Sequence, residues 1–270
     1  MNYFKASYRR WLGWLALATI FAVACAGLSN WQFARRAQVV AVIDQLNANY
    51  DRSPISLADV VSVESQRWQP VALTGHYLAE KGLLVRNRAR NGNPGFEQLV
   101  PFQTTSGIVF VDRGWVPTGQ EQDSPDLNPL PTAGEYQLVA HVMQGEPRLD
   151  RSAPEGQIAS INLYLAAHQL KLHPRVVARN FYLALSDESP QAKLAPLKLP
   201  RPDYTEGNHL SYALQWIAFA VMAFAALVWA IRKEFNEYRA ANDPNFQPQR
   251  RKKTRSESDA ETEDQILDRV

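Results

Sequence analysis

The sequence predicts an integral membrane protein: a two-helix transmembrane hairpin with an extracytoplasmic α+β domain built on an antiparallel sheet. Two apolar segments without formal charge, residues 11–34 and 209–231, are long enough to cross a hydrocarbon core of ~30 Å at ~1.5 Å per residue. Between them, residues 35–208 carry short β-branched and aromatic runs separated by Gly, Pro and Asn. This pattern is typical of antiparallel strands.

The first apolar segment has a rival interpretation as a cleaved signal peptide. Ala22 to Ala24 precede Cys25 in the manner of a processing site. The apolar run continues past Cys25 to Trp31 and Ala34, which favours an uncleaved anchor. Since Cys25 is the single cysteine, no intrachain disulfide can form.

Basic residues predict the orientation of the two spans. They gather in residues 1–10, before the first span, and in residues 232–270, after the second, so the positive-inside rule places both termini in the cytoplasm. We expect a short N-terminal tail and a largely disordered C-terminal tail. An N-terminal tail of about ten residues is too short for a mitochondrial presequence, which favours a bacterial plasma membrane. The net charge of +2 gives no indication of nucleic-acid binding.

The segment between the spans predicts a definite series of elements. Residues 36–49 have helical apolar spacing and read as an amphipathic stalk that continues the first span. One short helix is expected at 160–170, a late strand at 176–185, and an extended proline-rich segment at 189–204. Turns are expected at 91–95 and 104–107. The remaining predicted strands are residues 68–78, 82–90, 96–104, 107–116 and 134–143.

Polar and aromatic side chains mark the outer end of each span. On the second span, the helical spacing puts His209 on one face with Tyr212, Ala213, Trp216 and Ala220. The alanines form a strip that allows close helix packing. At the same depth, the first span carries Trp31, Gln32 and Arg35. The hairpin topology therefore predicts a pocket lined by an imidazole, aromatic rings and a guanidinium group.

Two interpretations of this outer end stay open from the residues alone. The aromatic rings fit an interfacial belt, and Gln32 and Gln215 can hydrogen-bond between the helices. A haem group would instead use a neutral His209 on iron, rings against the macrocycle and Arg35 near the propionates. The sequence has no phosphate-binding loop, no zinc-protease motif and no cysteine-based metal spacing, so no enzymatic activity is expected.

Several sequence blocks together resemble the surfeit locus protein one family of cytochrome c oxidase assembly factors. They are LSNWQFARR before residue 37, Gly-x-Tyr at 75–77, LLVRNR from 83, VFVDRGWVP from 109 and NHLSYALQW from 208. The resemblance implies a chaperone-like, non-catalytic role in a respiratory chain: assisting haem a insertion or retention in oxidase subunit I. It implies subunit I as a partner, with haem a synthase a further candidate, and His209 as the ligand of the haem iron.

The family motifs carry over to particular positions. Glycine's backbone freedom favours an architectural role for Gly75 and Gly114. Arg113 and Trp115 are either architectural or face the oxidase or the haem. The family usually has Leu-Gly before the Trp-Gln pair, whereas Leu28 is followed here by Ser and Asn. The matching positions are Trp31, Gln32, Arg35, Gly75, Arg113, Gly114, Trp115, His209, Tyr212, Gln215 and Trp216.

Two alternatives to a haem-handling factor remain. One is a scaffold that binds subunit I without touching the cofactor. The other is a membrane-tethered extracytoplasmic hydrolase, for which the sequence offers no discernible nucleophile and base.

Overall fold

A computed structural model describes residues 2–122 and 124–243, with side chains from residue 8 onward. The described chain divides into two compact units, residues 2–36 with 207–243 and residues 37–206. The second unit lies close to the predicted bounds of 35–208. Most of the predicted C-terminal tail, residues 244–270, lies outside the described residues.

Two long helices carry the apolar segments. Helix α1 spans Asn2–Asn49, and α4 spans His209–Asn242. Each is long and apolar enough to cross a membrane. Helix α1 runs without a break through the residues predicted as a stalk. The C-terminal tail was predicted to begin at residue 232, but residues 232–242 still belong to α4. No glycine or proline interrupts the helix there.

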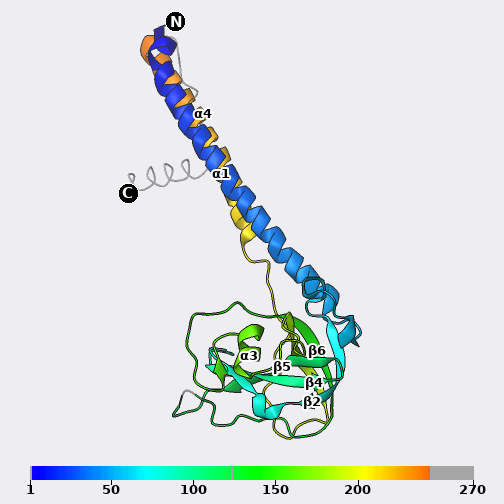
Figure 1. The fold of residues 1–270 in the computed structure, drawn as a ribbon. Helices are drawn as coiled ribbons and strands as arrows, with labels where there is room; N and C mark the ends of the chain where they lie inside the picture. The colour runs from blue at the N-terminus through cyan, green and yellow to red at the C-terminus, as the bar shows by residue number, and fades with distance from the viewer. Residues whose placement is uncertain (1, 123, 244–270) are drawn as a thin grey trace, which may run out of the picture. The chain divides into compact units, whose positions relative to one another are not determined.

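The helix pair in the first unit is antiparallel. Arg10, near the start of α1, forms an ion pair with Glu234, near the end of α4. Gln32 on α1 meets His209, the first residue of α4. Figure 1 shows the two helices side by side. From Arg10 to Gln32 the helix rises ~33 Å, so the two polar contacts bracket a span of about bilayer thickness.

The second unit is a closed barrel, which corrects the predicted antiparallel sheet (Figure 1). Its ring follows the order β2, β6, β8, β5, β4 and returns to β2. The neighbours are antiparallel except β5 and β8, which are parallel. A closed ring of five strands cannot alternate in direction throughout, so closure requires a parallel pair. The ring strands are β2 (Pro70–Tyr77), β4 (Gly95–Thr104), β5 (Gly107–Pro117), β6 (Tyr136–Gln144) and β8 (Phe181–Ser189).

Shorter elements decorate the ring. Helix α3 packs outside the barrel, in an apolar cluster with β3 and with residues of β4 and β5. Asn162 caps α3 by accepting from the Leu165 amide at 3.0 Å, as expected for an N-cap asparagine. These elements are β1 (Ile55–Ser56), η1 (Leu57–Asp59), α2 (Val63–Gln66), η2 (Ala79–Lys81), β3 (Leu83–Val85), β7 (Gln157–Ile158) and α3 (Leu163–Gln169).

Most predicted elements are found close to their expected places, but two strands are corrected. The strand predicted at 82–90 is limited to β3, at Leu83–Val85, and the late strand is displaced. The sequence predicts it at 176–185, whereas β8 spans Phe181–Ser189. Its polar end continues the ladder with β6, where Ser189 pairs with Gln137. Val177 instead forms an isolated bridge with Ile108 and joins the outer apolar cluster. Apolar alternation alone therefore located the strand about four residues early.

The barrel closes through a short seam between β2 and β4. Two residue pairs form it, His76 with Gln103 and Tyr77 with Phe102. A Cβ atom on the preceding Gly75 would lie 2.0 Å from the Gln103 carbonyl oxygen. Glycine is therefore needed at position 75 for the two backbones to approach, which explains the Gly-x-Tyr motif at this point.

We expect Gly75→Ala to destabilise the barrel. The methyl group must push β4 away from β2, at a cost of about 1–3 kcal/mol typical of overpacking. Thermal unfolding of the full chain in detergent, followed by tryptophan fluorescence, measures the loss. Thr74→Ala, on the exposed face of the same strand, serves as the control and should shift the midpoint far less. Equal midpoints for Gly75→Ala and the wild type would contradict the close-approach explanation.

Candidate functional site

The contact between Gln32 and His209 joins the two long helices at one end of the apolar span. His209 Nδ1 lies 2.8 Å from Gln32 Oε1, and both side chains are half-buried. An amide oxygen only accepts hydrogen bonds, so the Nδ1 atom carries the proton. In the neutral imidazole, Nε2 then holds the lone pair.

Small residues fix the register one turn further into the span. Ala213 is fully buried, and its carbonyl oxygen accepts a hydrogen bond from Ser29 Oγ at 3.0 Å. Cys25, on the same face of α1, is 1% exposed. On α1 the contact face carries Cys25, Ser29 and Gln32, and on α4 it carries His209, Ala213 and Trp216. In both helices these residues are separated by four and then three positions, as in closely packed helix pairs.

The space beside His209 Nε2 is shaped by a glycine. Gly207 has a φ of +65°, in the left-handed region that favours glycine. A Cβ atom on Gly207 would lie 3.8 Å from His209 Nε2 and 3.6 Å from Cδ2. A side chain at position 207 would therefore take up room next to the nitrogen that holds the lone pair.

The predicted haem-binding residues are brought together only in part. Gln32, His209 and the half-buried Trp216 lie along the helix contact. Trp31 and Tyr212 are 59% and 50% exposed, so they stand on the outward flanks of the pair rather than in a shared pocket. Gln215 and Arg35 are also exposed to the surroundings of the helices.

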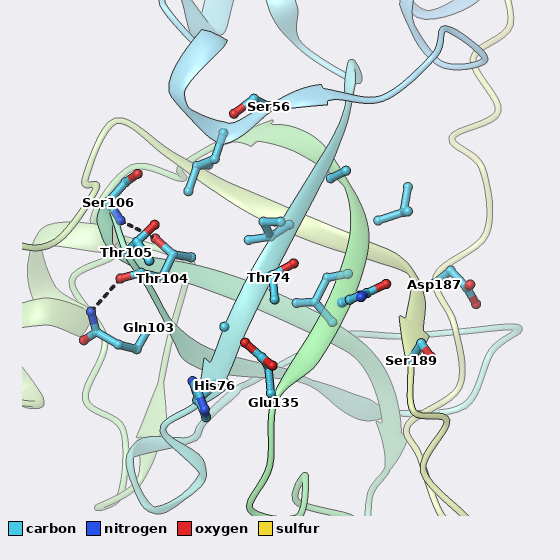
Figure 2. Close-up of a pocket in the computed structure, with 17 residues that line it drawn as sticks. Ser56, Thr74, His76, Gln103, Thr104, Thr105, Ser106, Glu135, Asp187 and Ser189 are labelled. Atoms are coloured by element: carbon cyan, nitrogen blue, oxygen red, sulfur yellow. Dashed lines mark hydrogen bonds between the residues drawn. The ribbon is translucent and has the colours of Figure 1, made fainter.

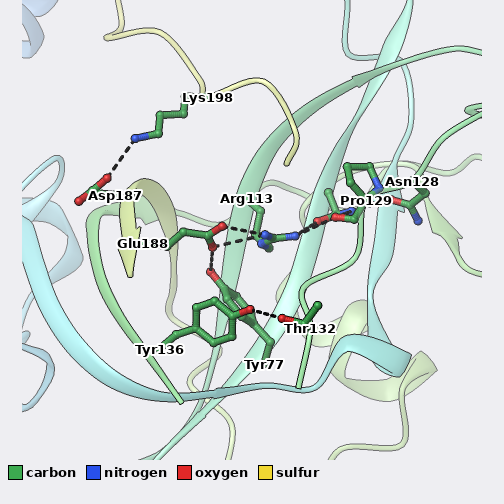
Figure 3. A network of polar contacts seen from close by, with 10 residues as sticks. Tyr77, Arg113, Asn128, Pro129, Thr132, Tyr136, Asp187, Glu188 and Lys198 are labelled. Carbon is green, nitrogen blue, oxygen red and sulfur yellow. Dashed lines mark hydrogen bonds and ion pairs between the residues drawn. The ribbon is translucent and has the colours of Figure 1, made fainter. Parts of the chain in front are cut away.

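The Arg-Gly-Trp block has an architectural place within the barrel. Arg113 continues the inward-facing series of Val109 and Val111 on β5. Its guanidinium, with a side chain 0% exposed, donates to Glu188 Oε1 at 2.9 Å. It also donates to Gln98 Oε1 at 2.8 Å and to the Pro129 carbonyl at 3.0 Å (Figure 3). Arg113 thus faces the barrel interior rather than a partner protein.

Tyr77 completes this buried network from the opposite wall. Its hydroxyl donates to Glu188 Oε2 at 3.1 Å, and the Arg113 guanidinium lies 5.0 Å from the centre of its ring. Burial raises the pKa of the Tyr77 phenol, and the neighbouring Glu188 carboxylate raises it further. The phenol therefore remains a hydrogen-bond donor in the conditions where the protein folds.

Gly114 and Trp115 attach the segment that follows β8. A Cβ atom on Gly114 would lie 2.5 Å from the Leu197 carbonyl oxygen, and Gly114 has a φ of +129°. This close approach lets the Trp115 backbone pair with Leu197 in both directions at 2.8 Å. The indole of Trp115 donates to the Arg88 carbonyl at 2.7 Å. The motif therefore holds the proline-rich segment against β5.

Asp112, next to Arg113, is buried without a charged partner of its own. Its Oδ1 accepts from the Gly114 amide at 3.0 Å, and its Oδ2 has no hydrogen-bond partner in the described residues. Burial raises the pKa of Asp112 well above its usual range, and Glu97 raises it further. Asp112 therefore keeps its proton to a higher pH than an exposed aspartate.

A cavity of about 690 Å³ lies on the outer wall of the barrel. Figure 2 shows Thr74 and His76 on β2, with Glu135 and Asp187 also lining it. Apart from Gly75, none of the sequence-predicted site residues lines this cavity. In the part of the chain that the structure describes, no hydrogen bond joins His76 to a hydroxyl or carboxylate group, as a nucleophile–base pair would require.

Some important residues were not predicted as contacts from the sequence. Ser29, noted there only as a departure from the resembled pattern, forms the interhelical hydrogen bond with the Ala213 carbonyl. The spacing of Cys25 and Ser29 ahead of Gln32 could have revealed this contact face. Glu188 and Gln98 gave no such signal, because the pairing of β8 and β4 with β5 brings them to Arg113.

Comparisons with known proteins agree with this arrangement. The model of the SURF1 family matches residues 19–221. An uncharacterised SURF1-like protein of Mycobacterium tuberculosis is 31% identical over 226 residues, 78% of this chain and 80% of that protein. Surfeit locus protein 1 of Xenopus tropicalis is 29% identical over 156 residues, 51% of this chain and 50% of that protein. The cytochrome oxidase assembly protein SHY1 of Saccharomyces cerevisiae is 29% identical over 108 residues, 38% of this chain and 27% of that protein.

The fold and the site define a class of protein in which two helices able to span a membrane precede and follow a closed β-barrel domain in the sequence, with a histidine–glutamine contact between the helices. The chain belongs to the SURF1 family, whose model covers most of its length. The matched region includes Gln32, the Arg-Gly-Trp block and His209.

The buried ion pair gives a prediction for the barrel. Arg113→Met leaves the Glu188 carboxylate buried without its partner, so we expect the free energy of unfolding to fall by about 3–5 kcal/mol. Adding Glu188→Leu should recover most of that loss, because no charge then remains buried. Denaturant unfolding of the full chain in detergent measures both effects.

An exposed ion pair provides the control for this prediction. Lys198 lies 3.2 Å from Asp187, and both side chains are exposed. Lys198→Ala should therefore cost at most about 1 kcal/mol. A similar small loss for Arg113→Met would show that the buried network does not hold the barrel together.

Proposed function

We propose that this protein is an assembly factor for a haem-copper cytochrome c oxidase and that it assists haem a insertion or retention in subunit I. The observation that carries the proposal is the contact between His209 Nδ1 and Gln32 Oε1, which leaves Nε2 with a lone pair beside Gly207. Membership of the SURF1 family supports it. The yeast relative's name as a cytochrome oxidase assembly protein supports the oxidase as the partner.

The residue types around His209 support this proposal. His209 would hold the haem through its iron, which an imidazole nitrogen can ligate. Trp31 is next to Gln32 in the sequence, and Tyr212 follows His209 by three residues. Both rings are exposed, so they are available to pack on a flat apolar ring. Arg35, one helical turn after Gln32, carries a charge suited to propionate groups. We propose that the bound form uses these groups around His209 and Trp216.

We further propose that both termini lie in the cytoplasm of a bacterial cell and that the barrel lies outside it. The antiparallel helix pair supports placing the termini on one side, since Arg10 meets Glu234. The basic residues near those ends support the cytoplasmic side. In this arrangement His209 and Gln32 lie at the outer surface of the bilayer, and the protein acts as a non-enzymatic chaperone. Haem a synthase is a further proposed partner, as the source of the haem.

A second candidate function is a scaffold that holds subunit I without binding haem. The exposure of Trp31 and Tyr212 favours it, because rings on the outer flanks of a helix pair can pack against a partner's helices or lipid. In a scaffold, the Gln32–His209 hydrogen bond serves to join the two spans.

The haem proposal predicts a spectrum that depends on His209. Protein purified from cells that make haem a should show a haem absorbance band, and His209→Ala should remove at least about 90% of it through loss of the axial ligand. His168→Ala, at an exposed histidine of α3, is the matched control and should keep the band. Absorbance per polypeptide is the measurement.

The same preparations separate the two candidates. A haem factor requires that oxidase haem content fall in cells with His209→Ala. If wild-type protein carries no haem under these conditions while subunit I still co-purifies with both forms, the scaffold function is correct and the haem proposal is wrong.

A further inference from the structure

The packing of the two long helices holds Gln32 at the level of His209. One turn away, the Ser29 hydroxyl bonds to the Ala213 carbonyl at 3.0 Å, and Ala213 is fully buried. This contact fixes how far α1 is shifted along α4. Gln32 follows Ser29 by three residues, and His209 precedes Ala213 by four, so the two side chains meet at the same level.

The direction of the hydrogen bond decides which ring nitrogen is available. Gln32 Oε1 accepts from His209 Nδ1 at 2.8 Å. His209 Nε2 has no hydrogen-bond partner in the described part of the chain, and Gly207 leaves room beside it. The imidazole is thus held in the tautomer that presents Nε2 as an electron-pair donor.

We propose that Gln32 is a positioning residue that fixes the Nδ1–H tautomer of His209 and thereby presents Nε2 to the haem iron. The inference rests on the proposed haem function. Histidines that ligate metals commonly donate their second ring N–H to an oxygen atom, and loss of that acceptor typically weakens metal binding 10–100-fold. Gln32 supplies this oxygen from the opposite helix. The packing of the two helices therefore also sets the tautomer of His209 that can ligate iron.

The reverse direction of the hydrogen bond has a different consequence. If the Gln32 amide were rotated, its NH₂ group would donate to Nδ1, and the proton would move to Nε2. That tautomer cannot ligate iron through Nε2. Glutamate at position 32 separates the two cases, because a carboxylate accepts but does not donate, whereas leucine does neither.

The first test reads the tautomer without haem. The full chain, labelled with ¹⁵N-histidine in detergent, is studied by NMR at about pH 8. The His209 signals are assigned by their loss in His209→Ala. We expect a protonated Nδ1 in the wild type and in Gln32→Glu, and a mixture of tautomers in Gln32→Leu. Gln191→Leu removes an exposed glutamine outside the two long helices and should change nothing. A protonated Nε2 in the wild type would overturn the inference.

The second test adds haem b, supplied as hemin, to the same four forms. Gln32→Leu should bind it about 10–100-fold more weakly than the wild type. Gln32→Glu should retain binding and show a lower reduction potential, because a charged acceptor makes the imidazole a stronger donor.

The two tests together distinguish failure of the inference from failure of the proposed function. Equal haem affinity and equal tautomers in the wild type and Gln32→Leu contradict a role for Gln32 while leaving His209 as a ligand. Absence of both hemin binding and co-purified haem a in the wild type, with the Nδ1 proton in place, contradicts the haem function while leaving the Gln32–His209 pairing.

Discussion

One buried guanidinium group connects the walls of the barrel. Arg113 on β5 bonds to Glu188 on β8 and Gln98 on β4, and Glu188 in turn accepts from Tyr77 on β2. The Tyr77 ring packs edge-on against Tyr136 on β6, with centroids 5.1 Å apart. The network therefore touches all five ring strands. Arg113 and Glu188 both follow the two residue pairs, Val111 with Leu183 and Asp112 with Ala184, that join β5 and β8 in parallel. A five-stranded ring cannot close without such a parallel pairing.

The elements of the fold that depend on neighbouring residues, such as hairpins, could be predicted from the sequence. The hairpin of β4 and β5 follows from two β-rich runs around a glycine turn, and Gly107 indeed has a φ of +128°. Closure of the ring could not be predicted, because it depends on the close approach of Gly75 to Gln103 at the seam between β2 and β4. The displaced start of β8 has a similar cause, since its polar end is defined by pairing with β6.

The contact between His209 and Gln32 could be predicted from the sequence, but the directions of the aromatic rings around it could not. Helical spacing and the hairpin topology bring His209 and Gln32 to the same level, and the structure joins them. Trp31 and Tyr212 share that level but lie on exposed flanks. Sequence spacing gives the height of a residue along a helix, whereas the direction it faces depends on the contact with the partner helix. That contact is set by Ala213, which belongs to the predicted alanine strip, and by Ser29 and Cys25 on α1, whose small side chains carry little chemical signal.

The register of the two long helices is the claim on which the site depends. It can be measured by disulfide cross-linking of Ser29→Cys with Ala213→Cys in a Cys25→Ser background, which leaves the two introduced thiols as the only cysteines. The account predicts rapid cross-linking on oxidation in membranes, because a disulfide requires Cα atoms within about 7 Å. Ser29→Cys with Leu214→Cys, at an exposed neighbour of Ala213, should cross-link slowly. Equal rates for the two pairs, or no cross-link in either, would contradict the register that brings Gln32 to His209.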